Sequence, residues 1–412
     1  MDRRALRVLH ISDHADPLAA PGTGFQGGQN VYVRSLAASL GALGHEVDVA
    51  TRWTSPRLPA RERIGAGARV VRLPAGAREP LHRDRFGEVL EEFSEEVDRL
   101  FRQGGGYDVV HSHYWYSGRV ALDLARRHRT PVVHTHHSLG AVRRAALDRA
   151  CPPLREESER RIGERADAVV VGCPAEADDL RRLLGTPGER MRLVPPGVDT
   201  SVLRPLDRAV ARRAVGLPAD VPVVLFLGRL EPRKGWEELV HAFSLVCRER
   251  PTAVLLVVGG CSTAETDPLV RLAGRYGILA NLRLCGSVPH DETALYYSCA
   301  DVTAVPSHYE PFGLVAVESM ACGTPVVATR VGGLSWTVAD ERVGALVPPR
   351  DPMSLADALL SVLDRGRDHF HEACLERVTA RFTSATWLNG IREVYRSVQM
   401  KRAASTGTPT GP

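Results

Sequence analysis

Short apolar runs alternate with longer amphipathic stretches along the whole chain, and this alternation limits the possible fold more than any other feature. In the first half, strand-sized runs lie at 6–11, 45–51, 108–113, 131–135, 168–172 and 192–195. Helix-like stretches such as 30–43, 83–101 and 120–128 lie between them. Strands that alternate with helices build βαβ units, so we expect a mostly parallel sheet with both faces covered.

The same alternation begins again after the stretch PPGVD at 195–199, whose prolines and glycine interrupt any regular element. Further strand-sized runs follow at 223–228, 253–259, 282–286, 302–306 and 325–329. Because 412 residues exceed the usual size of a single core, we predict two α/β domains, at 1–195 and 196–384. A last helix is predicted at 385–400, and the tail 401–412, rich in Ser, Thr, Gly and Pro, is predicted to be disordered.

The composition argues against several classes of protein. A net charge of +4 is small for this length, so we expect no nucleic-acid partner. No apolar stretch reaches the ~18 residues that a membrane span needs, and the apolar run near the N-terminus is too short for a signal peptide. The eight cysteines lie far apart without a C-x-x-C pair, which is typical of reduced thiols. We therefore expect a cytoplasmic protein, and the oligomeric state stays open, a homodimer included.

A glycine-rich loop that contains Gly27 and Gly28 lies between the first strand-sized run and the first helix. Glycines at such a place let backbone N–H groups approach a diphosphate, and the helix N-terminus adds partial positive charge. The alternative is a flexible strand-to-helix turn, since the loop has neither a Walker lysine nor a spaced G-x-G-x-x-G.

A second such loop, GRLEPRKG at 228–235, follows the first strand-sized run of the second domain. Arg229 and Lys234 offer two cations to a pair of phosphates, at the edge of the sheet where α/β proteins bind ligands. A solvated basic loop is the alternative interpretation.

The stretch EPFGLVAVE at 310–318 places two carboxylates at different depths. Glu310 is predicted in a turn after a strand, and Glu318 about two turns into an apolar helix. One carboxylate can bind sugar hydroxyls and the other a ribose diol, while amides near Gly313 face phosphates. Glu310 could instead be only a capping acid, but packing does not readily explain Glu318 on an apolar helix.

Histidines gather at the ends of two strand-sized runs, in HSHYW at 111–115 and HTHHSLG at 134–140. Two H-x-H patterns are typical of a metal site, as in metal-dependent hydrolases, but no matching set of Asp or Glu ligands accompanies them. Recognition of substrate hydroxyls by one or two of these imidazoles is the interpretation we favour.

Seven motifs, in this order, resemble the family-4 retaining glycosyltransferases of GT-B fold. They are GGQNVYV, HSHYW, HHSLG, PPGVD, GRLEPRKG, EPFGLVAVE and ACGTPVVAT. The chain is most similar to the branch that contains sucrose-phosphate synthase and the D-inositol-3-phosphate glycosyltransferase of the mycothiol pathway. The resemblance implies two Rossmann-like domains, an N-terminal acceptor domain and a C-terminal donor domain, whose parallel sheets face each other across a cleft. It also implies that the helix 385–400 crosses back onto the N-terminal domain.

The resemblance assigns roles to individual residues. It implies donor binding by Gly27, Gly28, Arg229, Lys234, Val288, Glu310, Phe312, Gly313, Leu314 and Glu318. Arg229 and Lys234 would neutralise the diphosphate, and Glu318 would bind the ribose. Glu310 and His137 would contact the donor sugar. The expected catalytic residues are His137, Glu310, Arg229 and Lys234.

The implied activity is retaining transfer of a hexose-type sugar, with UDP as the expected nucleotide and without metal or cofactor. Cations and a helix dipole would stabilise the departing diphosphate in place of a metal. Retention normally requires a carboxylate nucleophile, and the sequence places none near His137. The resemblance implies same-face attack instead, with a diphosphate oxygen helping to deprotonate the acceptor.

The expected acceptor is a small polar molecule such as a cyclitol or a sugar phosphate. The resemblance implies that Arg83, Tyr114, Ser138 and Arg155 bind it. Two guanidiniums on one phosphate would favour a phosphorylated acceptor. Arg155 could instead be a solvated residue of the charged stretch 155–165, and Arg83 and Ser138 stand where the branch has Lys and Thr. An aminocyclitol, as in aminoglycoside assembly, is therefore an alternative acceptor. A metal-dependent hydrolase and a nucleotide-sugar sensor are the alternatives of other classes.

Overall fold

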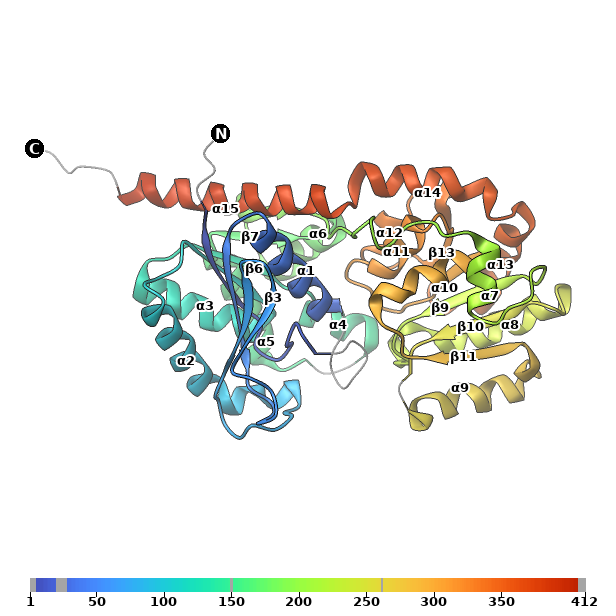
Figure 1. Ribbon diagram of the computed structural model, residues 1–412, viewed down its shortest axis with the longest axis horizontal. Helices are drawn as coiled ribbons and strands as arrows, with labels where there is room; N and C mark the ends of the chain where they lie inside the picture. The colour runs from blue at the N-terminus through green and yellow to red at the C-terminus, as the bar shows by residue number, and fades with distance from the viewer. Residues whose placement is uncertain (1–4, 20–27, 149–150, 261, 407–412) are drawn as a thin grey trace, which may run out of the picture. The chain divides into compact units, whose positions relative to one another are not determined.

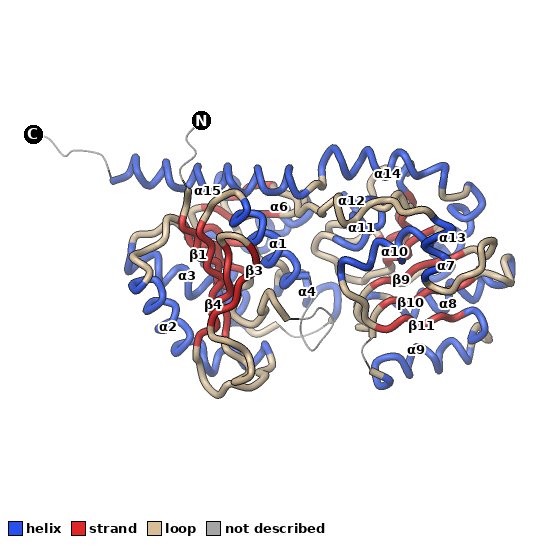
Figure 2. Tube along the Cα trace, in the orientation of Figure 1, coloured by secondary structure: helices blue, strands red, loops and turns tan. Residues whose placement is uncertain are grey.

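Two parallel sheets organise the chain, and each belongs to a separate unit with its own hydrophobic core (Figures 1 and 2). The computed structural model describes residues 5–19, 28–148, 151–260 and 262–406. Unit 1 comprises Met1–Val171, Ala177–Val194 and Leu388–Pro412, and unit 2 comprises Gly172–Glu176 and Pro195–Trp387. None of the helices described is both long and apolar enough to cross a bilayer.

The sheet of unit 1 has eight strands in the order β3-β4-β2-β1-β5-β6-β7-β8. Their bounds are β1 Arg7–Ile11, β2 Glu46–Arg52, β3 Arg61–Gly65, β4 Ala68–Leu73, β5 Val109–His113, β6 Val132–Thr135, β7 Ala168–Val171 and β8 Met191–Leu193. Neighbouring strands are parallel except β3 and β4, which form an antiparallel hairpin. The central strands are buried on both faces, which explains their runs of valine, leucine and isoleucine, although β1, β5 and β6 also carry buried histidines.

Helices cover both faces of this sheet. Their bounds are α1 Gly28–Ala42, η1 Arg83–Val89, α2 Leu90–Gln103, α3 Trp115–His128, α4 Gly140–Leu147, α5 Pro153–Arg165, α6 Pro174–Leu184 and η2 Gly188–Arg190. Helix α1 packs against β2, β3 and β4, whereas α3 packs against β1, β5 and β6 and against α2 and α5. Figure 2 shows α1 on one side of the red strands and the pair α2 and α3 on the other.

The last helix, α15 (Ser384–Thr406), is the long red helix that leads to the C-terminal end in Figure 1. From Leu388 onward it belongs to unit 1. It continues past residue 400 as far as Thr406, into the segment predicted to be disordered. Lysine, arginine and alanine at 401–404 are good helix formers, so they extend the helix before the Gly- and Pro-containing end of the chain.

The sheet of unit 2 has six parallel strands in the order β11-β10-β9-β12-β13-β14. Their bounds are β9 Val223–Leu227, β10 Val254–Val258, β11 Leu282–Gly286, β12 Val302–Val305, β13 Val326–Thr329 and β14 Gly344–Val347. The helices are α7 Arg208–Ala214, η3 Pro232–Lys234, α8 Trp236–Glu249, α9 Thr263–Arg275, η4 Leu279–Asn281, η5 His290–Glu292, α10 Thr293–Cys299, α11 Leu314–Ala321, α12 Leu334–Thr337, η6 Glu341–Val343, α13 Pro352–Arg365 and α14 Asp368–Arg381.

The predicted class, two α/β units with parallel sheets, is confirmed. Strands β3, β4 and β14 were not predicted. Strand β3 is an arginine-rich edge strand whose residues alternate between exposed and half-buried, so it carries no apolar run. Strand β14 is only four residues long. Both are recognised only by their pairing with neighbouring strands.

Candidate functional site

Lys234 and Glu310 form an ion pair at the carboxyl end of the unit 2 sheet. Lys234 ends η3, which follows β9, and Glu310 lies in the loop between β12 and α11. Their Nζ and Oε2 atoms are 2.6 Å apart, and the two side chains are only 16% and 14% exposed. Burial acts to raise the pKa of Glu310, but the charges of Lys234 and Arg233, together with a hydrogen bond from Lys234, hold the pKa below its ordinary value. Glu310 does not cap α11, because Gly313 occupies the N-cap position.

Arg229 belongs to a second charged group in the same loop. Glu231 accepts from Arg229 NH1 and from Arg233 Nε, at 2.6 Å in each case. The side chain of Arg229 is 25% exposed, so the loop is not the fully solvated basic loop of the alternative interpretation. Cations outnumber carboxylates when Lys234 and Glu310 are included, so this end of the sheet attracts anions.

Glu318 is a buried carboxylate in the middle of α11. It is 6% exposed, and it accepts a hydrogen bond of 2.7 Å from the hydroxyl of Tyr297. Its other oxygen lies 3.0 Å from Nε2 of His290. Burial acts to raise the pKa of Glu318, but these two partners lower it below its ordinary value. Glu318 is therefore ionised and fixed in position, as a group that binds a diol must be.

The turn before α11 brings backbone amides to the same region. Gly313 has a φ of 96°, and a Cβ there would lie 2.6 Å from Cδ2 of Leu334, so the turn requires glycine. The first amides of α11 then have no partner within the helix, which suits an anion. The ring of Phe312 packs in the core against Trp336 and Phe382, so only its backbone can face a ligand.

The positions of the other predicted donor-binding residues say little about how a donor binds. Leu314 opens α11 and is half-buried, and Val288, also half-buried, packs against the core just after β11. Gly28 is the exposed first residue of α1 in unit 1. Gly27 lies outside the described residues.

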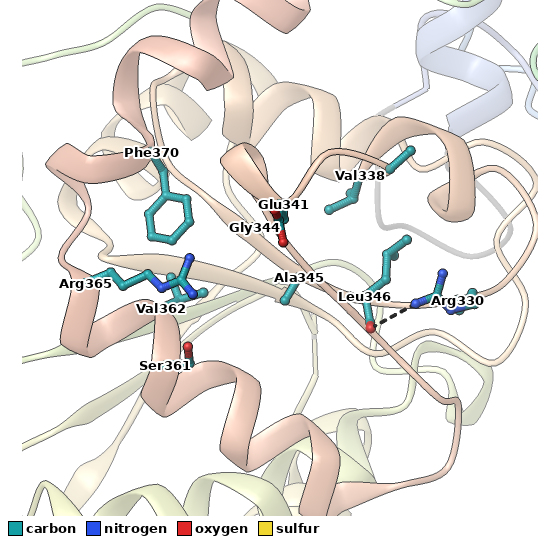
Figure 3. Close-up of a pocket in the computed structure, with 11 residues that line it drawn as sticks. Arg330, Val338, Glu341, Gly344, Ala345, Leu346, Ser361, Val362, Arg365 and Phe370 are labelled. Atoms are coloured by element: carbon teal, nitrogen blue, oxygen red, sulfur yellow. Dashed lines mark hydrogen bonds between the residues drawn. The ribbon is translucent and has the colours of Figure 1, made fainter.

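A separate pocket in unit 2 has a volume of about 300 Å³ (Figure 3). Its walls come from β14, α13 and α14, with Phe370 and Val362 among the apolar residues and Arg330 and Arg365 among the charged ones. Arg330 donates to the backbone oxygen of Leu346 at 3.5 Å. The lining includes none of the predicted donor-binding residues, so this pocket is not the predicted site.

In unit 1, the strand pleat sorts the histidines onto opposite faces of the sheet. His10 of β1 pairs in register with His111 of β5, so His10, His111 and His113 share one face. His134 of β6 pairs with Ser112, which places it on the opposite face. The two H-x-H motifs therefore do not form one cluster, which removes the basis for a metal-dependent hydrolase that uses both pairs.

The first face carries a line of hydrogen-bonded rings. His10 Nδ1 lies 2.8 Å from His113 Nε2, and His113 Nδ1 lies 3.0 Å from His137 Nε2. His10, His111 and His113 could be grouped as metal ligands, since their nitrogens lie within 4.8 Å of one another. However, the rings of His10 and His113 are nearly coplanar, at 7°, with centroids 5.1 Å apart, so the two nitrogens point at each other. Two nitrogens bound to a tetrahedral zinc ion at about 2.0–2.1 Å lie about 3.3 Å from each other, so a separation of 2.8 Å is that of a hydrogen bond.

Burial lowers the pKa of each of these histidines. The pKa of His10 and of His136 falls to about 3, and those of His111, His113 and His134 fall well below the ordinary value. Burial, with a smaller effect of His14, also lowers the pKa of His137 to about 3. All six rings are therefore neutral near pH 7. His137 is the one that is half-buried, and its φ of 58° is unusual for a residue other than glycine.

Three of the predicted acceptor-binding residues lie together beside this line. Arg155 NH1 donates to the hydroxyl of Tyr114 at 3.1 Å, and NH2 donates to Oγ of Ser138 at 3.0 Å. Arg155 is 5% exposed, so the alternative that it is a solvated surface residue is wrong. Burial raises the pKa of Tyr114, while the charges of Arg155 and, to a smaller extent, Arg83 oppose this.

Several partners of these residues were not predicted from the sequence. Glu159, fully buried, accepts from Arg155 Nε at 2.7 Å and from the backbone N–H of Gly140. Its spacing of four residues from Arg155 on α5 was a usable signal. No local pattern pointed to the other partners, which come from distant segments: His10, Tyr297, His290 and Tyr395.

Two family models match the chain. A model described as a glycosyl transferase 4-like domain matches residues 27–197, and one described as glycosyl transferases group 1 matches residues 207–376. A D-inositol 3-phosphate glycosyltransferase of Acidothermus cellulolyticus is 42% identical over 416 residues, which cover 97% of this chain and 92% of that protein.

Solved structures are also similar to this chain over nearly its whole length. Sucrose-phosphate synthase from Thermosynechococcus elongatus has a TM-score of 0.90 at 37% identity, over 96% of this chain and 100% of that one. HepE of Anabaena, solved in complex with UDP and glucose, has a TM-score of 0.73 at 20% identity, over 95% and 100%. At that lower identity the likeness concerns the fold alone. Together these structures confirm the predicted GT-B fold.

Proposed function

Because the chain belongs to the glycosyltransferase family that includes the D-inositol 3-phosphate glycosyltransferases, we propose that it transfers a hexose-type sugar from a UDP-sugar to a small phosphorylated acceptor. The observation that carries this proposal is the fixed guanidinium of Arg155. It donates to the hydroxyls of Tyr114 and Ser138, and the charge of Arg83 also acts on Tyr114. Hydroxyls and guanidiniums that converge in this way suit a phosphate monoester.

We assign donor binding to unit 2 because of the charged side chains in that unit. Lys234 and Arg229 face the end of the sheet with the amides before α11, and this combination suits a diphosphate. Glu318, held by Tyr297 and His290, is suited to a ribose diol. The complex of HepE with UDP and glucose makes UDP the first nucleotide to test.

Charge development explains how these residues accelerate transfer. When the anomeric C–O bond breaks, negative charge grows on the diphosphate, and Lys234, Arg229 and the α11 dipole stabilise that charge more than they stabilise the ground state. The neutral ring of His137 adds no positive charge beside the developing oxocarbenium ion. Lys234 must exchange some of its contact with Glu310 for the phosphate, which would release Glu310 to bind sugar hydroxyls.

Retention without a metal ion completes the proposal. In the described part of the chain, His137 contacts His113 and Tyr32, and neither is a carboxylate that could act as a nucleophile. Attack on the same face as the departing diphosphate, with one of its oxygens taking the acceptor proton, yields retention. The head-on geometry of His10 and His113 supports a reaction that does not use those histidines as metal ligands.

The experiment that tests this function measures release of nucleoside diphosphate from a panel of nucleotide sugars. Inositol phosphate, fructose 6-phosphate and an aminocyclitol serve as acceptors, with and without a chelator, and NMR coupling constants give the anomeric configuration of the product. We expect transfer from a UDP-sugar to a phosphorylated acceptor, with retention and no effect of the chelator. Transfer to the aminocyclitol alone would contradict the phosphorylated acceptor, and loss of activity with chelator would contradict the metal-independent mechanism.

Variants of the acceptor group sharpen this test. Arg155→Ala would leave the buried carboxylate of Glu159 unpaired, so Arg155→Lys, which keeps the charge but not the planar fork, is the better change. We expect Arg155→Lys and Arg83→Ala each to lower kcat/KM for the phosphorylated acceptor about 10- to 100-fold. Arg181→Ala removes an exposed ion pair with Asp178 and serves as the control.

A further inference from the structure

A continuous line of hydrogen bonds joins the C-terminal helix to His137 within unit 1. In order, it runs through Thr135, His111, Tyr395, His10, His113 and His137. Tyr395 projects from α15, and its hydroxyl lies 2.7 Å from His111 Nδ1 and 3.4 Å from His10 Nε2. All members except His137 are less than 9% exposed, so solvent reaches the line at one end only.

The protons along such a line must be ordered together. A neutral imidazole has one N–H donor and one acceptor nitrogen, and a hydroxyl has one proton. The imidazoles here are neutral, since burial holds the pKa of each histidine in the line well below its ordinary value. If one ring donates through Nε2, its neighbour must accept at Nδ1, and the same orientation passes to the next ring. The line therefore has two states, with either Nε2–H or Nδ1–H on all of its histidines.

The contacts of Tyr395 select one of these states. Its distance of 2.7 Å to His111 Nδ1 is that of an O–H donor, whereas 3.4 Å to His10 Nε2 is a long contact. The hydroxyl therefore donates to His111 and accepts from His10. His10 Nδ1 must then accept from His113, and His113 Nδ1 must accept from Nε2–H of His137.

We propose that Tyr395 is a positioning residue: by donating to His111 it orients the line so that His137 carries its proton on Nε2 and presents Nδ1 as an acceptor. The inference rests on the proposed function, in which His137 contacts the donor sugar. An acceptor nitrogen there selects a sugar hydroxyl, which can donate, over a phosphate oxygen, which cannot. The line thus sets which kind of group His137 binds, from a residue on the last helix.

The tautomers can be measured in the protein without any substrate. Two-bond correlation spectra of ¹⁵N-labelled histidine distinguish protonated from unprotonated ring nitrogens, and a His137→Gln sample assigns the signals of His137. We expect the Nε2–H form for His10, His111, His113 and His137. The Nδ1–H form on His113 or His137 would overturn the proposal, whatever the activity of the protein.

Tyr395→Phe tests the role of the hydroxyl. Without it, His137 should populate both tautomers, and kcat/KM for the donor should fall about tenfold. Tyr107→Phe is the matched control, because Tyr107 is also a buried tyrosine of unit 1, and its hydroxyl donates to Asp48 rather than to a histidine. An unchanged His137 tautomer in Tyr395→Phe would overturn the proposal while leaving the glycosyltransferase activity intact.

Different results would refute the proposed function and the proposed role of Tyr395. If no acceptor is glycosylated, the proposed function fails, but the tautomers of the wild-type protein still decide the role of Tyr395. If Tyr395→Phe does not fold, the wild-type spectra decide, because the predicted state is a property of the native protein. A His10→Phe variant interrupts the line at a second point and should change the tautomer of His137 in the same way.

Discussion

Lys234 and Glu310 show how one contact can serve both the unliganded protein and the reaction. Each partner is largely shielded from water, so each needs an opposite charge. A diphosphate can replace Glu310 as the partner of Lys234, and sugar hydroxyls can replace Lys234 as the partner of Glu310. The ion pair therefore keeps both groups charged and in place until the donor arrives.

We predict that Lys234→Ala lowers kcat/KM for the donor roughly 30- to 1,000-fold, because loss of a charge-assisted contact costs about 2–4 kcal/mol. Initial rates of nucleoside diphosphate release measure this effect. Arg250→Ala, which breaks an exposed ion pair with Asp364, is the control and should have wild-type rates. Wild-type turnover in Lys234→Ala would refute the donor assignment.

The same variant should also be less stable, since Glu310 would keep a charge without its partner. Adding Glu310→Gln removes that charge, so the double variant should have a higher midpoint of urea denaturation than Lys234→Ala alone. If the second change lowers the midpoint further, the two residues stabilise the fold independently and are not coupled.

At the scale of elements, the turn between η3 and α8 shows why glycine is needed after Lys234. Gly235 has a φ of 69°, and a Cβ there would lie 1.9 Å from the backbone oxygen of Pro306 at the end of β12. Gly216, after α7, has a φ of 71° but nothing within 4 Å of such a Cβ. The two positions share a backbone conformation and differ in crowding.

We predict that Gly216→Ala lowers the free energy of unfolding by about 1–2 kcal/mol, the cost of a left-handed conformation. Gly235→Ala should cost a further 1–3 kcal/mol or so, because the backbones of the turn and β12 must move apart. Urea denaturation of the two variants measures the difference. Equal losses would show that the turn relaxes without strain.

The buried histidines in and after β1, β5 and β6 make the stability of the protein sensitive to acid. His10 and His136 have a pKa of about 3 in the folded protein and an ordinary value of 6.5 when unfolded, so the unfolded chain binds more protons between these values. Their contribution to stability is complete above pH 6.5 and is lost as the pH falls. At about pH 5.5 each should have lost about 1.4 kcal/mol, or about 3 kcal/mol together.

Urea denaturation at about pH 7.5, 6.5 and 5.5 measures this loss. His111, His113 and His134, whose pKa values are also lowered, should add to it. A His136→Gln variant should lose less stability on acidification than the wild type. A free energy of unfolding that stays constant over this range would mean that these rings are solvated and titrate normally.

These elements also show what sequence can and cannot predict. Most of the strands, the loops after them and the carboxylates of 310–318 follow from local apolar runs and glycine positions, so they were predictable, whereas β3, β4 and β14 were not. The separation of the two H-x-H motifs was not, because it depends on the register between strands far apart in sequence. The contact between His111 and Tyr395 was not predictable either, because the two residues are 284 positions apart. Burial of Arg155 was equally hidden, since α5 is otherwise rich in charged residues.

At the scale of the whole molecule, the proposed donor and acceptor groups belong to different units. Lys234, Arg229 and Glu318 lie in unit 2, whereas Tyr114, Ser138 and Arg155 lie in unit 1. Each unit has its own core, so each substrate should stabilise the unit that binds it, by mass action. Variants of the two groups should therefore separate the effects of the two substrates.

We predict that UDP at about 100 times its Kd stabilises the wild-type protein by about 2.7 kcal/mol. Hydrogen exchange measured by mass spectrometry should locate this protection in unit 2, around η3 and the first turn of α11, because those amides would face the diphosphate. Arg155→Lys should keep the protection, since its change lies in the acceptor group of unit 1, whereas Lys234→Ala should lose most of it. Equal protection by UDP in Lys234→Ala and the wild type would place the diphosphate elsewhere, and loss of protection in Arg155→Lys would mean that the two groups do not act on separate substrates.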